Sequence, residues 1–210
     1  MAIAAALLVA LGIGLLAERL GWLRPRAAWA AALVGGLPLW AGGIPAALAV
    51  LFFVAVGSLA SRWNPSSRDR RGRTALQILA NGLPAALGIA LGSPVFFLGA
   101  LAAACADTLA SEIGAGSRRA WHPLKGWVES GTNAAVSLRG TLALGLGALI
   151  FVPWAGWLEV PGWPVWAGGV AGALADTLLG LLEDRFEGWT NDLTNLLTTT
   201  VGGVVALLLA

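Results

Sequence analysis

Long runs of apolar residues, separated by short polar stretches, constrain this fold more than any other feature of the sequence. Residues 143–152 and 201–210 carry no polar side chain, so neither run can supply the polar face that an outer helix of a water-soluble bundle needs. Charged residues make up 11% of the chain, against about 25% in soluble domains. We therefore predict that residues 1–210 form a single all-α integral membrane domain, a polytopic bundle of transmembrane helices.

The apolar segments are numerous enough for about eight membrane spans. A helix that crosses a bilayer core of about 30 Å needs about 20 apolar residues. The second and third segments are short and separated by Gly42 and Gly43, so a count of seven spans stays open. The eight segments cover residues 2–17, 27–40, 44–59, 75–91, 95–111, 134–152, from Pro164 to about 182, and from Asp192 to 210.

The basic residues of the loops predict an orientation in the membrane. Every loop Lys and Arg falls in the connections after the first, third, fifth and seventh segments, and the opposite connections contain one charge, Glu159. Because cytoplasmic loops carry an excess of Lys and Arg, we expect a multi-pass protein of the cell membrane with these basic loops in the cytoplasm. Both termini would then face outward.

An acidic residue lies inside the fifth apolar segment. Asp107 follows thirteen residues that begin at Pro94 and contain no charge. A carboxylate inside a membrane span costs about 2.5 to 3.5 kcal/mol by insertion scales and therefore marks a candidate functional site. On a helix, Asp107 shares a face with Ser111, and Thr108 shares one with Glu112, which places a ladder of oxygen atoms at one end of a span.

A short repeat predicts a second acid at the same depth. The block Ala-Asp-Thr-Leu at residues 106–109 recurs at residues 175–178, and each block precedes a polar loop that contains Thr-Asn, residues 132–133 or 190–191. Both spans run in the same direction in the predicted topology, so the repeat would be a parallel two-helix unit. Asp107 and Asp176 would then lie at equal depth, as two carboxylates near the cytoplasmic face.

Paired carboxylates of this kind indicate a metal site. Like charges at one depth repel each other unless a cation lies between them or one group is protonated. Mg²⁺ fits because it takes oxygen ligands and is usually held by one or two carboxylates plus substrate phosphates. The alternative left open is that the same side chains cap helices or join them by hydrogen bonds. The predicted metal ligands are Asp107, Glu112, Asp176 and Asp192, and the predicted catalytic residues are Asp107, Glu112, Asp176 and Asn133.

Cations on the same side suggest that the ligand carries phosphate. Arginine binds phosphate bidentately and lysine binds it as a point charge. Attraction of these residues to anionic membrane lipid is the simpler explanation, and it stays open. The chain has no P-loop motif, and its one His and one Cys exclude the usual zinc sites. The predicted substrate-binding residues are Arg118, Arg119, Lys125, Gln77, Asn81, Thr108, Ser111, Thr132, Asn191 and Asn195.

These motifs together resemble one family, the integral-membrane family that includes phytyl-phosphate kinase of the vitamin E pathway and was long catalogued as a domain of unknown function. The resemblance covers nearly the whole chain, and Leu109 and Ala134 depart from it. The family usually has an aromatic residue at the position of Leu109 and Gly at the position of Ala134. The motifs are residues 77–82, Ala-Asp-Thr at 106–108 with Ser-Glu-Ile-Gly at 111–114, Gly-Thr-Asn at 131–133 with Val-Ser and Gly-Thr at 136–137 and 140–141, Gly172 with 176–180, and 191–195.

The resemblance implies an enzyme, a phosphotransferase that moves a phosphoryl group from a nucleoside triphosphate, CTP in related kinases, to an isoprenyl monophosphate. Phosphoryl transfer depends on positioning and electrostatics, which agrees with carboxylates, Mg²⁺ and phosphate-binding cations. Two alternatives stay open: an ion-coupled transporter with paired intramembrane Asp, and a CTP-dependent lipid cytidylyltransferase that releases pyrophosphate. We expect membrane lipid and no nucleic acid as further partners. The prenyl chain, the nucleotide base and the oligomeric state are not determined by the sequence.

Overall fold

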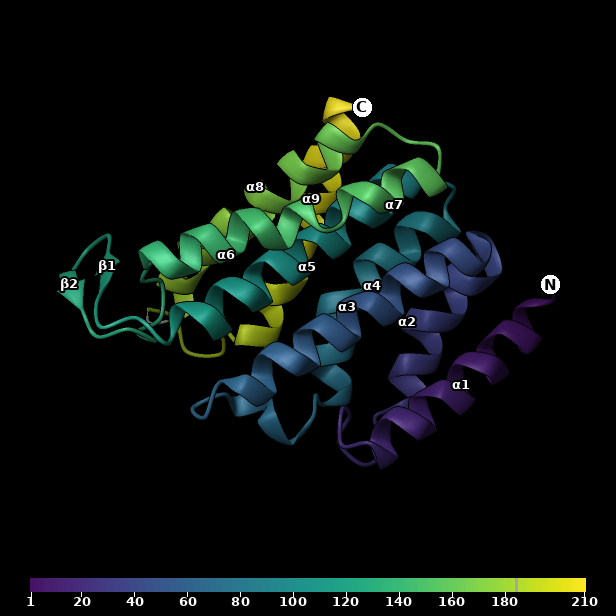
Figure 1. Ribbon diagram of the computed structural model, residues 1–210, viewed down its shortest axis with the longest axis horizontal. Helices are drawn as coiled ribbons and strands as arrows, with labels where there is room; N and C mark the ends of the chain where they lie inside the picture. The colour runs from purple at the N-terminus through teal and green to yellow at the C-terminus, as the bar shows by residue number, and fades with distance from the viewer. Residues whose placement is uncertain (184) are drawn as a thin grey trace.

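The protein is an all-α helical bundle in a computed structural model that describes residues 1–183 and 185–210, apart from the side chain of Arg68 (Figure 1). The predicted fold class is thereby confirmed. The helices are α1 Ile3–Arg19, α2 Ala28–Ala41, α3 Gly43–Trp63, the 3₁₀ turn η1 Arg68–Arg71, α4 Ala75–Ala90, α5 Pro94–Gly114, α6 Leu138–Leu149, α7 Val152–Trp157, α8 Gly162–Glu183 and α9 Asn191–Leu209, with strands β1 Ala120–His122 and β2 Gly126–Val128.

All eight predicted apolar segments form helices, and within the described residues five stretches are long and apolar enough to cross a membrane. They are α3, α5, α6 together with α7, α8 and α9, whereas α2 and α4 are apolar but shorter. The third segment is longer than predicted, because α3 begins at Gly43, whose φ of 67° suits glycine, and continues for 21 residues. The predicted loop at residues 153–164 is in part the short helix α7.

Helix α5 lies at the centre of the bundle, where every residue from Phe97 to Ala106 is buried. Glycines of α8 allow close approach: a Cβ at Gly172 would lie 2.5 Å from that of Ala103, and one at Gly169 would lie 2.8 Å from that of Ala102. The paired residue numbers rise together along both helices. Helices α5 and α8 are therefore parallel, as the repeat predicted.

The partner helix of each unit packs antiparallel to α5. On α9, Gly202 faces Ala103, and Ala206, farther along the chain, faces Gly99. On α6, Gly147 faces Ala106, while residue 140, earlier in the chain, faces residues 110 and 114. Small residues thus let α6, α8 and α9 approach the backbone of α5, which is a common way for membrane helices to associate.

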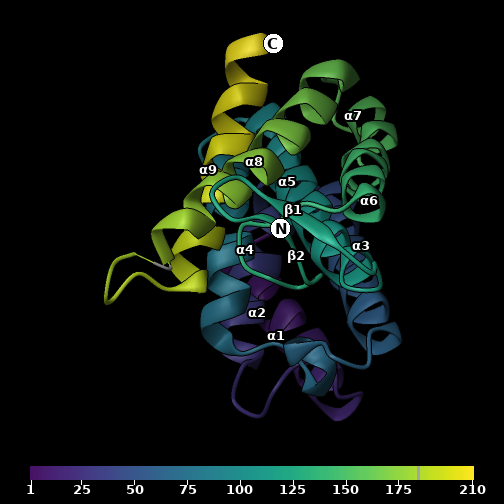
Figure 2. The ribbon, with the colours of Figure 1, turned by 90° about the vertical axis from the view of Figure 1, so that its left-hand side faces the viewer.

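The four polar connections meet at one end of the bundle, the end that faces the viewer in Figure 2. The first and second are joined by a hydrogen bond of 2.9 Å from the backbone N–H of Arg24 to the carbonyl of Arg73. Ser67 of the second donates to Glu112 at the end of α5, and Asn133 of the third donates to the carbonyl of Gly180 on α8. The predicted segregation of basic and apolar connections is confirmed, and which side of the membrane each end faces stays a prediction.

The polar stretch of residues 112–133 contains a β-hairpin that the sequence analysis did not predict. Strands β1 and β2 pair antiparallel, with Trp121 opposite Trp127, and a backbone bond of 2.7 Å from Trp121 ties the hairpin to Val136. The turn passes through Gly126, whose φ is 71°. In Figure 1 the hairpin extends beyond the helix ends, so it forms an outer part of the polar end.

Candidate functional site

A cavity of about 900 Å³ opens at the polar end of the bundle, between α4, α5, α8 and α9 and the connections that join them. Twelve of the residues that the sequence predicted for the site line this cavity, although they come from five separate stretches of the chain. The fold therefore brings the predicted motifs together around one space. The twelve are Gln77, Asn81, Asp107, Thr108, Ser111, Glu112, Thr132, Asn133, Asp176, Asn191, Asp192 and Asn195.

Asp107 and Asp176 lie at equal depth in the cavity wall. Each stands seven residues before the last residue of its helix, Gly114 for α5 and Glu183 for α8, or about 10 Å from the helix end at 1.5 Å per residue. Their side chains come within hydrogen-bonding reach of each other. Thr198 of α9 donates a hydrogen bond of 3.1 Å to Oδ1 of Asp176, which fixes that carboxyl group against its neighbour.

This pair fits a magnesium ion that also binds a phosphate. Two facing carboxyl groups need a shared proton or a cation between them. Among the described residues, no three His, Cys, Asp or Glu side chains converge closely enough to hold a metal ion by themselves. A site of two carboxylates plus substrate phosphates is the arrangement that Mg²⁺ commonly uses, so Asp107 and Asp176 are the residues that would hold it.

Glu112 has a different environment from these two aspartates. Its Oε1 accepts hydrogen bonds from Ser61 at 2.7 Å and Ser67 at 2.6 Å, and its Oε2 accepts one from Asn64 at 2.8 Å. These donors come from the end of α3 and the connection that follows. Glu112 therefore joins the end of α5 to the end of α3, and its predicted catalytic and metal-binding roles stay predictions.

Glu183 is a further acid in the cavity lining, and it was not among the site residues predicted from the sequence. Its Oε2 accepts a hydrogen bond of 3.2 Å from Nδ2 of Asn133, and its Oε1 accepts one from Thr194 of α9. Asn133 therefore joins the connection after the hairpin to the end of α8. The available signal was the spacing, since Glu183 lies two helical turns after Asp176 and on the same side of the helix.

The predicted polar side chains are also partly engaged with the protein. Gln77 closes a capping box with Thr74 at the start of α4, and its Nε2 donates to Asp69 at 2.7 Å. Asn81 donates to the carbonyl of Gln77 at 3.0 Å. Other hydroxyls donate to carbonyl oxygens at 2.7 to 3.0 Å: Thr108 to Ala104, Ser111 to Asp107 and Thr132 to Glu129.

Residues of α9 complete the wall opposite α4. Asn191 begins the helix after the N-cap Thr190, and Asp192 occupies the first turn, where a negative charge interacts favourably with the helix dipole. Asn195 is buried one turn farther on. Their predicted contacts with substrate, and the predicted metal contact of Asp192, stay predictions.

Arg73 is the cation that lines the cavity, and the site prediction did not include it. The residue is 5% exposed, and its guanidinium lies 4.9 Å from the centre of the Phe53 ring. Its Nη2 donates a hydrogen bond of 3.4 Å to Oγ1 of Thr108, the neighbour of Asp107. Burial lowers the pKa of Arg73, while the nearby Asp69 carboxylate raises it. The available signal was its place as the last arginine before the capping box of α4.

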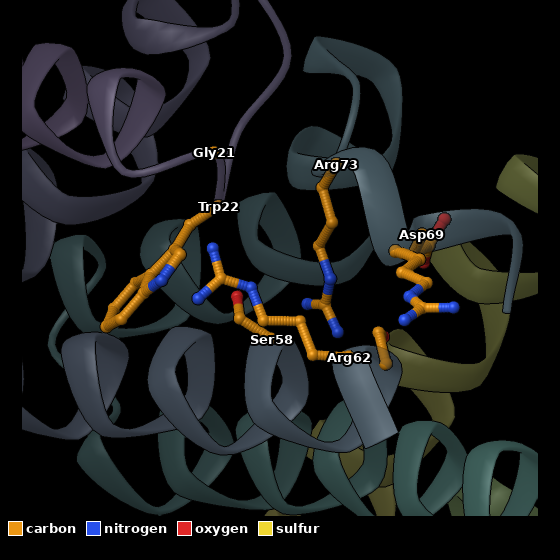
Figure 3. Close-up of a pocket in the computed structure, with 8 residues that line it drawn as sticks. Gly21, Trp22, Ser58, Arg62, Asp69 and Arg73 are labelled. Atoms are coloured by element: carbon orange, nitrogen blue, oxygen red, sulfur yellow. The ribbon is translucent and has the colours of Figure 1, made fainter. Parts of the chain in front are cut away.

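Figure 3 shows how this arginine is placed. Its side chain extends between those of Arg62 and Asp69 toward helix α3, where Ser58 lies. The hydroxyl of Ser58 is buried and, among the described residues, has no hydrogen-bond partner. Arg62 turns away and donates to the carbonyl of Leu20 at 2.6 Å. The two arginines thus lie in the same crevice, but Arg73 alone of the two reaches the cavity.

The three cations predicted to bind substrate lie elsewhere. Arg118 and Arg119 precede β1, Lys125 lies in the turn of the hairpin, and all three side chains are exposed. None of them is among the residues that line the cavity. Their predicted phosphate contact is untested, and the structure does not bring them to the twelve residues around Asp107.

The cavity lining is strongly acidic. In the part of the chain that the structure describes, six carboxylates and one basic side chain line it. A free anion would be repelled from such a surface, whereas a cation or a metal-bound anion would be attracted. The acids are Asp69, Asp107, Glu112, Asp176, Glu183 and Asp192.

Comparisons with known proteins place this geometry in a family context. Residues 8–203 match the model of the family described as Integral membrane protein DUF92. The chain is also similar to Uncharacterized membrane protein MJ0933 of Methanocaldococcus jannaschii, with 31% identity over 194 residues that cover 84% of this chain and 81% of that protein. No solved structure matches the chain.

Proposed function

The chain belongs to the integral membrane protein family DUF92, and from the cavity at its polar end we propose that it is a phosphotransferase that converts an isoprenyl monophosphate into the diphosphate. The donor is a nucleoside triphosphate, for which CTP is the first choice. The observation that carries the proposal is the facing pair Asp107 and Asp176, set about 10 Å from the helix ends in a polar cavity inside a membrane bundle.

The position of the pair suits a reaction between a water-soluble donor and a lipid acceptor. The cavity opens among polar connections, through which a nucleotide can enter. Leu174 of α8 lines the cavity and is exposed, so the outer face of this apolar helix is suited to contact with a prenyl chain. The phosphate of such a lipid would lie at the depth of the two aspartates while its chain stays among the helices.

The reaction requires positioning more than covalent help from the protein. An oxygen of the acceptor phosphate attacks the terminal phosphorus of the triphosphate; the new P–O bond forms as the bond to the bridging oxygen breaks, and the nucleoside diphosphate leaves. The acceptor is already an anion, so no strong general base is needed. Bound Mg²⁺ would neutralise the charge on the phosphates. Asp107 and Asp176 would hold this ion. The amides of Asn81 and Asn195, which line the cavity, would donate hydrogen bonds to phosphate or nucleotide oxygens.

Analysis of the products tests the proposal directly. Purified protein is incubated with Mg²⁺, CTP and geranylgeranyl monophosphate, and the nucleotide and lipid products are identified. We expect CDP and the prenyl diphosphate in equal amounts. Release of pyrophosphate with a cytidylylated lipid would instead identify a cytidylyltransferase, and the absence of turnover with every triphosphate tested would overturn the phosphotransferase.

The acidic lining favours one second candidate, an ion-coupled transporter. Six carboxylates around one cavity would attract a cation even without phosphate. The pair lies near the helix ends, however, whereas transporter sites lie near the bilayer midplane. Uptake of a cation into vesicles that contain the protein, without nucleotide turnover, would favour this candidate.

A further inference from the structure

Arg73 is a buried cation that forms no ion pair with a carboxylate in the described part of the chain. Among the described residues its side chain has one hydrogen bond, to the neutral hydroxyl of Thr108, and one ring contact, with Phe53. Asp69, Glu112 and Asp107 act on it electrostatically, but Asp69 is engaged by Gln77 and Glu112 by donors from α3 and the connection after it. A buried charge without an ion-pair partner is costly, and in a cavity wall such a group is a candidate binding residue.

The backbone of α3 makes room for this guanidinium. A Cβ at Gly57 would collide with Nη2 of Arg73. Glycine at this position is otherwise unfavourable in the middle of a helix, by about 1 kcal/mol relative to alanine. Because Gly57 has no side chain, the guanidinium fits between α3 and Thr108, on the same cavity wall as Asp107.

We infer that Arg73 is the phosphate-binding cation of the cavity, and that its ligand is a phosphate group that enters together with a divalent cation. The inference rests on the proposed function and adds the residue that receives the anion. A guanidinium with five N–H donors binds phosphate oxygens in a fork, and one of these donors is used by the protein. The six carboxylates of the lining explain why the phosphate would enter with a divalent cation. They would repel phosphate alone but not phosphate bound to a metal ion.

The test measures binding and needs no turnover. Thermal unfolding of the purified protein in detergent is followed with Mg²⁺ and, in separate arms, inorganic pyrophosphate, CTP or geranylgeranyl monophosphate. A ligand that binds the native state raises the unfolding temperature in proportion to its affinity. We expect stabilisation of the wild type by at least one probe with Mg²⁺, and by none of them without a divalent cation.

Arg73→Met removes the charge and keeps an apolar side chain of similar length. We expect its affinity for the stabilising probe to fall about ten- to a hundredfold, the range for a lost charge-assisted hydrogen bond. Its unfolding temperature without ligand should stay level or rise, because a buried charge has been removed. The matched control is Arg62→Met, in the same crevice but away from the cavity, which should bind within twofold of the wild type.

A second variant keeps the charge and displaces it. Gly57→Ala should push the guanidinium from its place and weaken binding, while Gly145→Ala, whose Cβ would meet no atom within 4 Å, should not. A loss confined to CTP assigns Arg73 to the donor, and a loss confined to the prenyl phosphate assigns it to the acceptor.

The outcomes separate this inference from the proposed function. Binding of every probe within twofold of the wild type in both Arg73→Met and Gly57→Ala would overturn the role of Arg73 and leave the phosphotransferase intact. A wild type that binds pyrophosphate through Arg73 but forms no prenyl diphosphate would overturn the proposed function alone. A wild type that none of the probes stabilises would overturn both.

Discussion

The cavity wall and the β-hairpin of residues 120–128 lie at the same end of the bundle, but the charges in and beside them are held in opposite ways. The wall is acidic, and its side chains are fixed by hydrogen bonds between helices, as for Asp176 with Thr198 and Glu112 with Ser61. Lys125 in the turn of the hairpin, and Arg118 and Arg119 just before its first strand, are exposed; these three are the hairpin cations. Charges in a partly buried wall act strongly on a ligand, whereas exposed charges are screened by water and salt.

This difference separates the cations of the polar end by where they lie. The sequence does not distinguish the basic residues of the polar end by their surroundings. Arg118, Arg119 and Lys125 were predicted to bind phosphate because they follow Asp107 and Glu112 most closely along the chain. In the structure, Arg73 reaches the wall from the preceding connection instead. The hairpin cations remain suited to interaction with anionic lipid headgroups, worth about 1 kcal/mol per residue near a membrane surface.

The largest expected contrast is all-or-none and concerns the side of the membrane that both regions face. In a background with the buried Cys105 replaced by Ala, Ser66→Cys reports on the cavity wall, Leu124→Cys on the hairpin, and Glu159→Cys on the opposite end. An impermeant thiol reagent applied to intact cells should label Glu159→Cys and leave the other two unmodified. Labelling of Ser66→Cys or Leu124→Cys from outside would contradict the predicted orientation.

Replacing either aspartate of the pair should have the largest effect on activity. Asp107→Asn and Asp176→Asn each remove a charge that the proposed Mg²⁺ site requires, so we expect the rate of diphosphate formation to fall about a hundredfold or more. The unfolding temperature without ligand should not fall, because the repulsion between the two groups is relieved. Activity is measured per folded molecule, with Glu159→Gln at the other end as the control. Either variant with wild-type activity would remove that aspartate from the site.

Replacing Glu112 should affect stability before activity. Glu112→Ala leaves the hydroxyls of Ser61 and Ser67 and the amide of Asn64 without their acceptor, so we expect a loss of about 1 to 3 kcal/mol in the free energy of unfolding. Glu112→Gln should lose less, because its carbonyl oxygen still accepts. Glu129→Ala, an exposed acid, is the control. A stable Glu112→Ala protein without activity would support the predicted catalytic role.

The sequence was sufficient for features that depend on pattern. Eight apolar segments, the grouping of basic connections at one end and the parallel pair α5 and α8 all follow from hydropathy, charge and the repeated Asp-Thr-Leu block. Twelve predicted site residues line one cavity because polar side chains inside apolar helices must face a partner or a cavity.

Features that depend on contacts between residues far apart in the chain could not be predicted from sequence patterns. The donors to Glu112 lie 45 to 51 residues earlier in the chain, so this link between α5 and α3 carries no local signal. Thr-Asn at 132–133 and 190–191 look equivalent, but Thr190 caps α9 whereas Ser137 caps α6. Arg73 looks like its neighbours Arg70 and Arg71 in the sequence, and it is distinguished by its contacts with Gly57 and Phe53 of α3 and Thr108 of α5.

The smallest expected effect concerns the hairpin cations, and it decides whether the comparison between wall and hairpin holds. Arg118→Gln, Arg119→Gln and Lys125→Gln each remove one exposed charge, and exposed charges contribute about 1 kcal/mol or less. We expect each to change the affinity for the Mg²⁺-bound probe less than about fivefold, well short of Arg73→Met, with salt reducing the difference further. Protein is normalised to the folded, inserted fraction, because loss of a basic residue can also reduce insertion. A tenfold or larger loss for any of the three would mean that the hairpin folds over the cavity when ligand is bound. The phosphate role predicted for these residues would then stand beside that of Arg73.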